Sequence, residues 1–314
     1  MIEAILILVG FVLLYYGGEW LVGGGASLAV KAGITPLVVG LTVVAFGTSC
    51  PELMVSVDAA LTGHGEISIG NVVGSNIFNI ALILGMSAMI KPLKVKLQLL
   101  RFDTPIMILV TVLFTIFFID RNISRIEALI LFLGLITYTV VVIRMARSEV
   151  KKSKSAGDYN EIKAEYDLSV CIFFIAAGLI TLVVGARFLV DGAIMIAKAF
   201  NISEAVIGLT IVAAGTSLPE LATSVVASAR KQSDISIGNI VGSNIFNILC
   251  IVGIAGLISP ISAPGISNFD IFTMLLTAGI LFTLMKTGFT INRFEGLILL
   301  LIYIGYVAYL WPKN

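Results

Sequence analysis

Residues 38–85 read VVGLTVVAFGTSCPELMVSVDAALTGHGEISIGNVVGSNIFNIALILG, and residues 206–253 read VIGLTIVAAGTSLPELATSVVASARKQSDISIGNIVGSNIFNILCIVG. The two stretches align without a gap at an offset of 168, and 30 of their 48 positions are identical. A gapless internal repeat of this length, with more than half of its positions identical, indicates two versions of one structural unit. The fold is therefore expected to consist of two related halves.

The chain around these stretches is strongly apolar. Of its 314 residues 58% are hydrophobic and only 12% are charged, a composition that is rare in soluble domains. Apolar runs long enough to cross about 30 Å of hydrocarbon recur along the whole chain. They predict an all-α polytopic membrane protein with ten transmembrane helices. We place these helices at about residues 3–28, 36–62, 68–90, 103–119, 124–146, 168–197, 204–229, 236–258, 269–286 and 293–311.

The composition also limits the partners and the chemistry. A net charge of +1 gives no basic or acidic excess that would favour nucleic acid, so the lipid bilayer is the expected partner and no obligate protein partner is evident. Three cysteines without a regular spacing provide neither a disulfide framework nor a CxxC metal pair. The first apolar run lacks a basic start and a small-residue cleavage site, so we expect a first transmembrane helix and no removed signal peptide there.

Five helices in each half determine how the halves are related. Residues 1–147 form the first five-helix repeat, 148–167 a polar linker and 168–314 the second repeat. Because five is odd, the second repeat must enter the membrane from the opposite side, which predicts inverted repeats. With the N-terminus outside, fifteen Lys and Arg residues fall in inward segments and four in outward ones. This positive-inside bias predicts a cell-membrane protein with both termini outside and a cytoplasmic linker.

Each repeat contains the element Gly-Thr-Ser-x-Pro-Glu in the middle of a predicted helix, at 47–52 and 215–220. Glycine and proline predict a break in the helix at that point, with a hydroxyl residue capping the second part and free carbonyls at the end of the first. Glu52 and Glu220 then lie near the bilayer centre, where a carboxylate is costly and usually functional. Oxygen ligands around two carboxylates suit Ca²⁺ or Na⁺. The structural alternative is that the glutamates only cap the broken helices.

The second element, Gly-Asn-x-Val-Gly-Ser-Asn-Ile-Phe-Asn, occupies 70–79 and 238–247. Its serine and last asparagine are four residues apart and share a helix face. We therefore predict ligand roles for Ser75, Asn79, Ser243 and Asn247. For the remaining asparagines (Asn71, Asn76, Asn239 and Asn244), hydrogen bonds between helices are the favoured interpretation.

The two elements, present twice in inverted halves, resemble the α-repeats of the sodium/calcium exchangers in the calcium/cation antiporter superfamily, in particular the short prokaryotic type. The resemblance implies that Ca²⁺ is bound by Glu52, Glu220 and backbone oxygens of Thr48 and Thr216. It assigns the sodium sites to the same glutamates, the carbonyls of Ala45 and Ala213, and the hydroxyls of Thr48, Ser49, Ser75, Thr216, Ser217 and Ser243. Asparagine at 79 and 247, where some relatives have aspartate, implies independence from potassium. By the same resemblance, the first and sixth helices slide as a pair past the helices that hold the site.

The expected function is thus secondary antiport of Na⁺ against Ca²⁺ with a stoichiometry of about three to one, without a cofactor and without enzymatic activity. Antiport with H⁺, or of Mg²⁺ or Mn²⁺, remains an alternative, and a cation channel could use the same oxygens. An intramembrane hydrolase is disfavoured because the single histidine, His64, falls in a loop. Outside the motifs, Glu19 and Arg187 occupy equivalent positions in the first and sixth helices. We interpret them as interfacial ion-pair or snorkelling residues.

Overall fold

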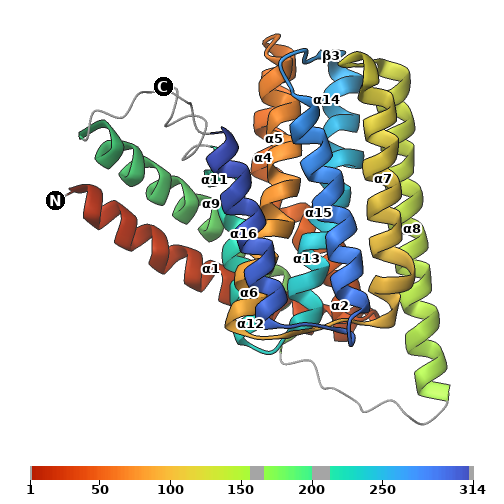
Figure 1. The fold of residues 1–314 in the computed structure, drawn as a ribbon. Coiled ribbons are helices and arrows are strands. Elements are labelled where there is room, and N and C mark those ends of the chain that lie inside the picture. Colours follow the sequence, from red (N-terminus) through yellow and green to blue (C-terminus); the bar gives the residue numbers. More distant parts are fainter. Residues whose placement is uncertain (1, 156–165, 200–212, 311–314) are drawn as a thin grey trace.

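The computed structural model describes residues 2–155, 166–199 and 213–310, and this part of the chain is almost entirely helical (Figure 1). In the first half the helices are α1 (Ile2–Ala32), α2 (Pro36–Val39), η1 (Gly40–Val44), α3 (Ala45–Thr48), α4 (Cys50–Leu61), α5 (Gly65–Ile77), η2 (Phe78–Leu84), α6 (Gly85–Ile90), η3 (Leu99–Asp103), α7 (Thr104–Phe117), η4 (Phe118–Asp120) and α8 (Arg125–Ser155). In the second half they are α9 (Leu168–Ala199), α11 (Ala213–Gly215), α12 (Leu218–Ala229), α13 (Ser233–Phe246), η6 (Asn247–Val252), α14 (Gly253–Ile258), α15 (Asn268–Lys286) and α16 (Arg293–Leu310).

The helix lengths make this a multi-pass membrane protein. In the described ranges eight helices are long and apolar enough to cross a bilayer, and a bent pair, Pro36–Thr48 with Cys50–Leu61, gives nine if it is counted as one span. These nine agree with predicted spans to within a few residues at most ends. The remaining prediction, 204–229, lies outside the described residues as far as residue 212, and its second part is α11 and α12.

Two local features go beyond the sequence prediction. The fifth helix, predicted to end at about residue 146, continues as α8 to Ser155, into the first residues of the predicted linker. The reason is that the Lys and Glu residues after position 148 are good helix formers, so charge alone does not end the helix. The rest of that linker up to residue 165 lies outside the described residues.

Four two-residue strands also accompany the helices, which the all-α prediction did not include. β1 (Leu93–Lys94) pairs antiparallel with β4 (Thr290–Ile291), and β2 (Asn122–Ile123) with β3 (Ile261–Ser262). Each pair joins the first half of the chain to the second. Since α7 runs between β1 and β2 along the chain, the two pairs lie at opposite ends of that helix.

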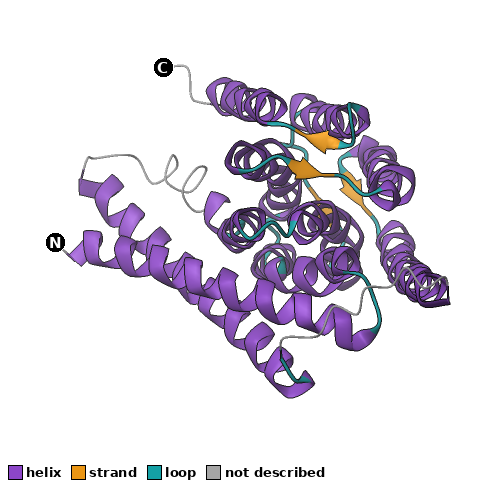
Figure 2. Cartoon of the chain, turned by 90° about the horizontal axis from the view of Figure 1, so that it is seen from below, coloured by secondary structure: helices purple, strands orange, loops and turns teal. Residues whose placement is uncertain are grey.

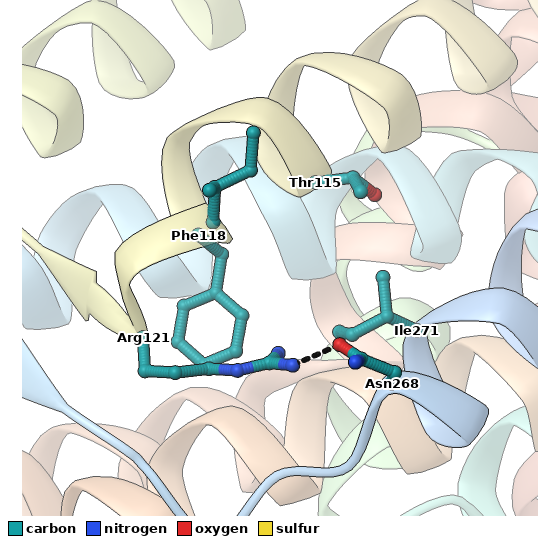
Figure 3. A pocket seen from close by; sticks show the side chains of 6 residues that line it. Thr115, Phe118, Arg121, Asn268 and Ile271 are labelled. Carbon is teal, nitrogen blue, oxygen red and sulfur yellow. Dashed lines mark hydrogen bonds between the residues drawn. The ribbon is translucent and has the colours of Figure 1, made fainter.

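The connection from α7 to β2 is held by polar and aromatic contacts. Arg121 has a left-handed backbone (φ 64°), its guanidinium lies 5.4 Å from the Phe118 ring centre, and it donates to Asn268 at the start of α15. Together with Thr115 and Ile271 these side chains line a cavity of about 150 Å³ (Figure 3). The arrangement fixes α15 to the end of α7.

The helices α1 and α9 lie side by side and diverge from the other helices toward the end that carries the N-terminus (Figures 1 and 2). Their contact is lined by glycine. A Cβ on Gly17 would lie 2.9 Å from the backbone N of Leu182, and one on Gly178 would lie 2.8 Å from the backbone N of Leu21. The backbones therefore touch directly, as in small-residue contacts between membrane helices. We call these two helices the α1/α9 pair.

The remaining helices form a bundle around α13, the most deeply buried of the long helices described. α13 packs against α2, η1, α3, α7 and α12. Gly242 of α13 makes this approach possible, because a Cβ there would lie 2.7 Å from the carbonyl O of Leu41. Widened π-helical turns follow both α5 and α13, at Phe78–Leu84 and Asn247–Val252. Such turns recur at functional sites in other proteins.

Candidate ion-binding site

Two helices begin near the middle of the bundle, and each places a glutamate in its first turn. The helix ending at Thr48 and the helix starting at Cys50 meet at an angle of 47°, with Ser49 between them. Glu52 follows in the first turn of α4, and Glu220 occupies the same position in α12 after Ser217. Both glutamates are 1% exposed. We call them the two central carboxylates.

Each central carboxylate accepts a hydrogen bond from the other repeat. The Ser49 hydroxyl donates to Oε1 of Glu220 at 2.9 Å, and the Ser217 hydroxyl donates to Oε1 of Glu52 at 2.8 Å. Ser49 and Ser217 do occupy the N-cap positions, but neither side chain caps its own helix. The capping prediction was therefore right in position and wrong in role, because each hydroxyl donates its hydrogen to the carboxylate of the other repeat in a charge-assisted bond and accepts no backbone N–H of its own helix.

Several buried oxygens around these contacts have no hydrogen-bond partner among the described residues. They include the second carboxylate oxygen of both central carboxylates. The others in predicted ligand residues are the Ser243 hydroxyl and the amide oxygens of Asn79 and Asn247. Unpaired buried carboxylate oxygens are costly unless a cation or a donor compensates them. These oxygens are consequently available to a cation.

The asparagines at 71 and 239 hold each repeat's two elements together. The Asn71 amide donates to the Glu52 carbonyl at 3.1 Å and to the Ser56 hydroxyl at 2.9 Å. Asn239 makes the same pair of contacts with Glu220 and Ser224. The sequence interpretation of these asparagines as hydrogen-bonding residues agrees with these contacts. It missed Ser56 and Ser224, although their identity in the two repeats was a usable signal.

The asparagines at 76 and 244 orient the two amides that we predicted as ligands. Asn79 donates its amide N–H to Oδ1 of Asn244 at 3.1 Å, and Asn247 donates to Oδ1 of Asn76 at 3.0 Å. Because the nitrogen of each predicted ligand is occupied, its oxygen is the atom left for another partner. The contacts come in pairs related by the offset of 168.

The other predicted site residues differ in how available they are. Ser75 is buried, and its hydroxyl oxygen lies 3.1 Å from that of Ser217, whose hydrogen is donated to Glu52. The Thr48 hydroxyl bonds to the carbonyl of Val44 at 3.1 Å and to Asn239 at 3.2 Å, and Thr216 makes the corresponding contact with Asn71 at 3.4 Å.

The carbonyls that we expected to be free at the break are partly used. The carbonyl of Ala45 accepts the backbone N–H of Ser49 at 3.1 Å and lies 3.4 Å from the Thr48 hydroxyl, because the four-residue spacing of α-helical hydrogen bonds continues as far as Ser49. A carbonyl has two lone pairs, so Ala45 keeps limited capacity for another partner. Its counterpart Ala213 begins α11.

The chemistry of the assembled groups is simple. Two carboxylates, two amide oxygens and several hydroxyls supply only oxygen atoms, and their formal charge is −2 when both carboxylates are ionised. Hard cations such as Ca²⁺ and Na⁺ prefer this donor set, whereas soft metals prefer sulfur or imidazole. Because the donors belong to both repeats, a cation bound there would contact both halves of the chain.

Comparison with known proteins agrees with this chemistry. The family described as sodium/calcium exchanger protein matches residues 2–144 and 170–311. A putative antiporter, CaxA of Alkalimonas amylolytica, is 37% identical over 98% of both chains. The sodium/calcium exchanger MaX1 of Methanosarcina acetivorans is 33% identical over 99% of both chains. A solved structure of the sodium-calcium exchanger NCX_Mj, soaked with 10 mM Na⁺ and zero Ca²⁺, superposes with a TM-score of 0.85 at 33% identity and 98% coverage of each chain.

Proposed function

This chain belongs to the sodium/calcium exchanger protein family, and from that premise we propose that it is a secondary antiporter that exchanges Na⁺ for Ca²⁺ by alternating access. Like its relatives, it is a transporter and not an enzyme. The observation that carries the proposal is the pair of crossed contacts, in which Ser49 bonds to Glu220 and Ser217 bonds to Glu52. Because the site is built from both repeats, its geometry depends on how the two halves are placed relative to each other.

In this proposal the central carboxylates bind both ions. Glu52 and Glu220 hold Ca²⁺ with backbone oxygens of Thr48 and Thr216. Sodium uses the same glutamates with the hydroxyl and carbonyl oxygens predicted from the sequence, and Asn79 and Asn247 turn their free amide oxygens toward the site. Since both cargoes require the same two carboxylates, a full sodium load excludes calcium. This competition is the physical basis of antiport.

The proposed architecture has ten membrane spans in two inverted repeats of five. The hydrogen bonds paired at an offset of 168 support a two-fold relation between the halves. The excess of Lys and Arg in alternate loops supports a cell-membrane protein with both termini outside and the linker in the cytoplasm. The α1/α9 pair is the proposed moving part, because it touches the bundle along one flank.

Charge balance sets the proposed stoichiometry. One Ca²⁺ brings a doubly ionised site to zero, and three Na⁺ bring it to +1, so a full cycle moves one net charge. That charge is worth about 2.3 kcal/mol per 100 mV of membrane potential. The same reasoning separates antiport from a channel, since a channel needs no counter-ion.

The test is ⁴⁵Ca²⁺ uptake into sodium-loaded proteoliposomes with the voltage clamped by a potassium ionophore. An inside-positive potential should accelerate uptake, because net positive charge leaves as calcium enters, and a pH gradient alone should drive little. If voltage had no effect and protons replaced sodium fully, a proton-coupled antiporter would be the better conclusion. Uptake without any counter-ion would indicate a channel, and preference for Mg²⁺ or Mn²⁺ would change the cargo.

A further inference from the structure

An ion pair joins the α1/α9 pair to the bundle. Arg230, directly after α12, donates from Nε to Oε1 of Glu19 at 2.9 Å and from a second nitrogen to Oε2. The side chains are 43% and 17% exposed, respectively. Beside this contact Gly18 lies against α12, where a Cβ would be 3.1 Å from Cγ2 of Val226. The ion pair thus ties α1 to α12, the helix whose first turn contains Glu220.

The equivalent place in the other repeat is open. At an offset of 168, Gly18 and Glu19 correspond to Ala186 and Arg187 of α9, and Val226 corresponds to Asp58 of α4. Val226 is only 5% exposed because α1 covers it, whereas Asp58 is exposed. Met54, one turn before Asp58, is 73% exposed. The α1/α9 pair therefore covers α12 and leaves the matching face of α4 uncovered, in accord with its divergence from the bundle in Figure 1.

The charges at the open place differ from those around Glu19. At the same offset Arg230 corresponds to the neutral Thr62, and the acid at the open place is Asp58, one helical turn before it. If the α1/α9 pair moved to the symmetry-related position, Ala186 would lie against Asp58 as Gly18 now lies against Val226. Arg187 would then face Thr62, as Glu19 now faces Arg230, and its long side chain could turn to the Asp58 carboxylate on the same helix face, four residues before Thr62. Within the described part of the chain, neither Arg187 nor Asp58 has an ion-pair partner in the present arrangement.

We propose that Glu19–Arg230 and Arg187–Asp58 are alternative ion pairs, each holding the α1/α9 pair at one end of its movement. This proposal rests on the alternating-access function proposed above. The acid lies on the moving helix in one state and the base in the other, so the two pairs cannot form together. All four residues are positioning residues, because the two ion pairs set the populations of the two states without touching the cation.

Distances between spin labels on the moving and fixed helices test the proposal. Labels at Leu61→Cys on α4 and Met195→Cys on α9, both at exposed positions, report whether the open face is covered. The full-length protein is reconstituted in lipid nanodiscs after the three native cysteines are replaced. Glu19→Gln should raise the ratio of short to long distances about two- to fivefold, the effect of losing one partly exposed ion pair. Adding Arg187→Gln or Asp58→Asn to that variant should lower the ratio again by a similar factor.

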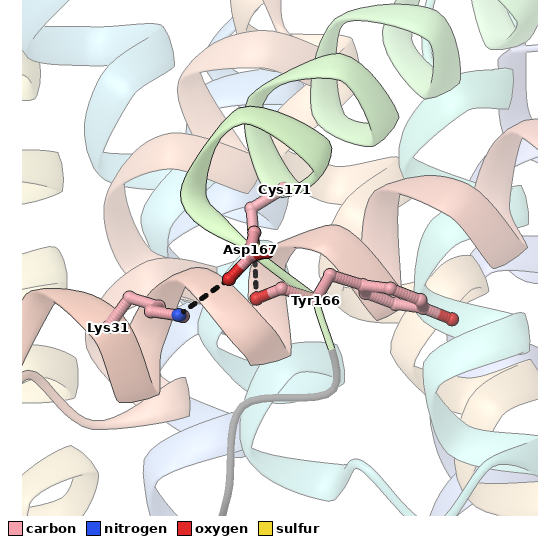
Figure 4. Close-up of polar contacts among 4 residues, drawn as sticks. All are labelled: Lys31, Tyr166, Asp167 and Cys171. Carbon is pink, nitrogen blue, oxygen red and sulfur yellow. Dashed lines mark hydrogen bonds and ion pairs between the residues drawn. The ribbon is translucent and has the colours of Figure 1, made fainter.

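A matched control comes from the ion pair between Lys31 and Asp167, which joins the end of α1 to the residue before α9 at 3.2 Å (Figure 4). Because both partners belong to the moving part, Asp167→Asn should leave the ratio unchanged. The charge exchange Glu19→Arg with Arg230→Glu should restore the wild-type ratio, which a merely structural loss would not do.

The outcomes separate the two proposals. No change in Glu19→Gln, or a shift in the same direction for Glu19→Gln and Arg187→Gln, would overturn the alternative ion pairs. The labels need no transport, so absence of exchange in the flux assay would refute the proposed function and leave the distance result to be judged by itself.

Discussion

Neutralising one central carboxylate should abolish calcium transport and also stabilise the ion-free protein. In Glu52→Gln the hydrogen bond from Ser217 can persist, because glutamine keeps an oxygen at the same place. The second oxygen of Glu52 has no partner among the described residues, and the effective cost of burying an uncompensated charge is several kcal/mol. A charge-assisted hydrogen bond returns about 1.5–3 kcal/mol, and its neutral replacement about 1 kcal/mol. We therefore expect the ion-free variant to gain about 1–3 kcal/mol.

Calcium should stabilise the wild type and leave the variant unchanged. A ligand at a hundred times its dissociation constant stabilises the wild type by about 2.7 kcal/mol, which raises Tm by about 5 °C in a protein of this size. Glu52→Gln leaves a single carboxylate that cannot neutralise Ca²⁺, so this increase should vanish. Calcium flux should fall about a hundredfold or more, the equivalent of the 3–5 kcal/mol lost when a buried charge pair is broken. Glu220→Gln should behave in the same way.

The assay is thermal unfolding of purified protein by intrinsic fluorescence, with and without calcium, alongside flux in proteoliposomes. Glu149→Gln is the control, because this exposed residue near the end of α8 should keep the full calcium effect. A Glu52→Gln protein that retains the calcium-induced increase in Tm, or wild-type flux, would refute the reasoning. An ion-free variant less stable than the wild type would show that Glu52 has a structural partner we have not recognised.

Three further changes test the packing and the connection. Gly242→Ala should lower the free energy of unfolding by about 1–3 kcal/mol, because the new methyl would overlap the carbonyl O of Leu41 and Cβ of Ala45. The control Gly305→Ala should leave it unchanged, because Gly305 has no described neighbour within 4 Å. Equal Tm values for the two variants would contradict this prediction. Asn76→Ala should cost about 1–3 kcal/mol in the same unfolding assay, because it removes the acceptor for the Asn247 amide; an unchanged Tm would show that water replaces it. Replacing residues 156–165 by Gly and Ser at equal length should leave flux within about a few-fold, and a complete loss in a folded protein would reveal a regulatory role.

The sequence predicted most of the helices and the meeting of the two motifs, because an internal repeat and the length of an apolar run can be recognised without knowing how the helices pack. It could not predict which hydrogen bonds Ser49 and Ser217 make, since the acceptors come from the opposite repeat and depend on how the halves dock. The four short strands were missed because two residues carry no periodic pattern. The helical continuation of α8 was missed because a charged composition fits both a linker and an exposed helix.

The ion pair at Glu19 was likewise only partly predictable from the sequence. Its type was predictable from a charged residue within an apolar membrane helix. Its partner was not, because Arg230 is 211 positions away and is brought close only by the crossing of α1 over α12. The repeat is most informative at equivalent positions whose surroundings differ in the structure, such as Val226, which is buried, and Asp58, which is exposed.

The two strand pairs have a mechanical consequence. Leu93 is paired with Ile291 at one end of α7, and Ile123 with Ile261 at the other, so the two halves of the bundle are clamped to each other at both membrane surfaces. Two halves joined in this way resist tilting against each other, because a tilt would break the backbone hydrogen bonds of one strand pair or the other. In the proposed exchange, this stiffness leaves the movement to helices that the strand pairs do not tie. Among the long helices of the described ranges, α1 and α9 have no strand at either end; the site helices α4 and α12 have none either, but they pack against α5 and α13 of the bundle.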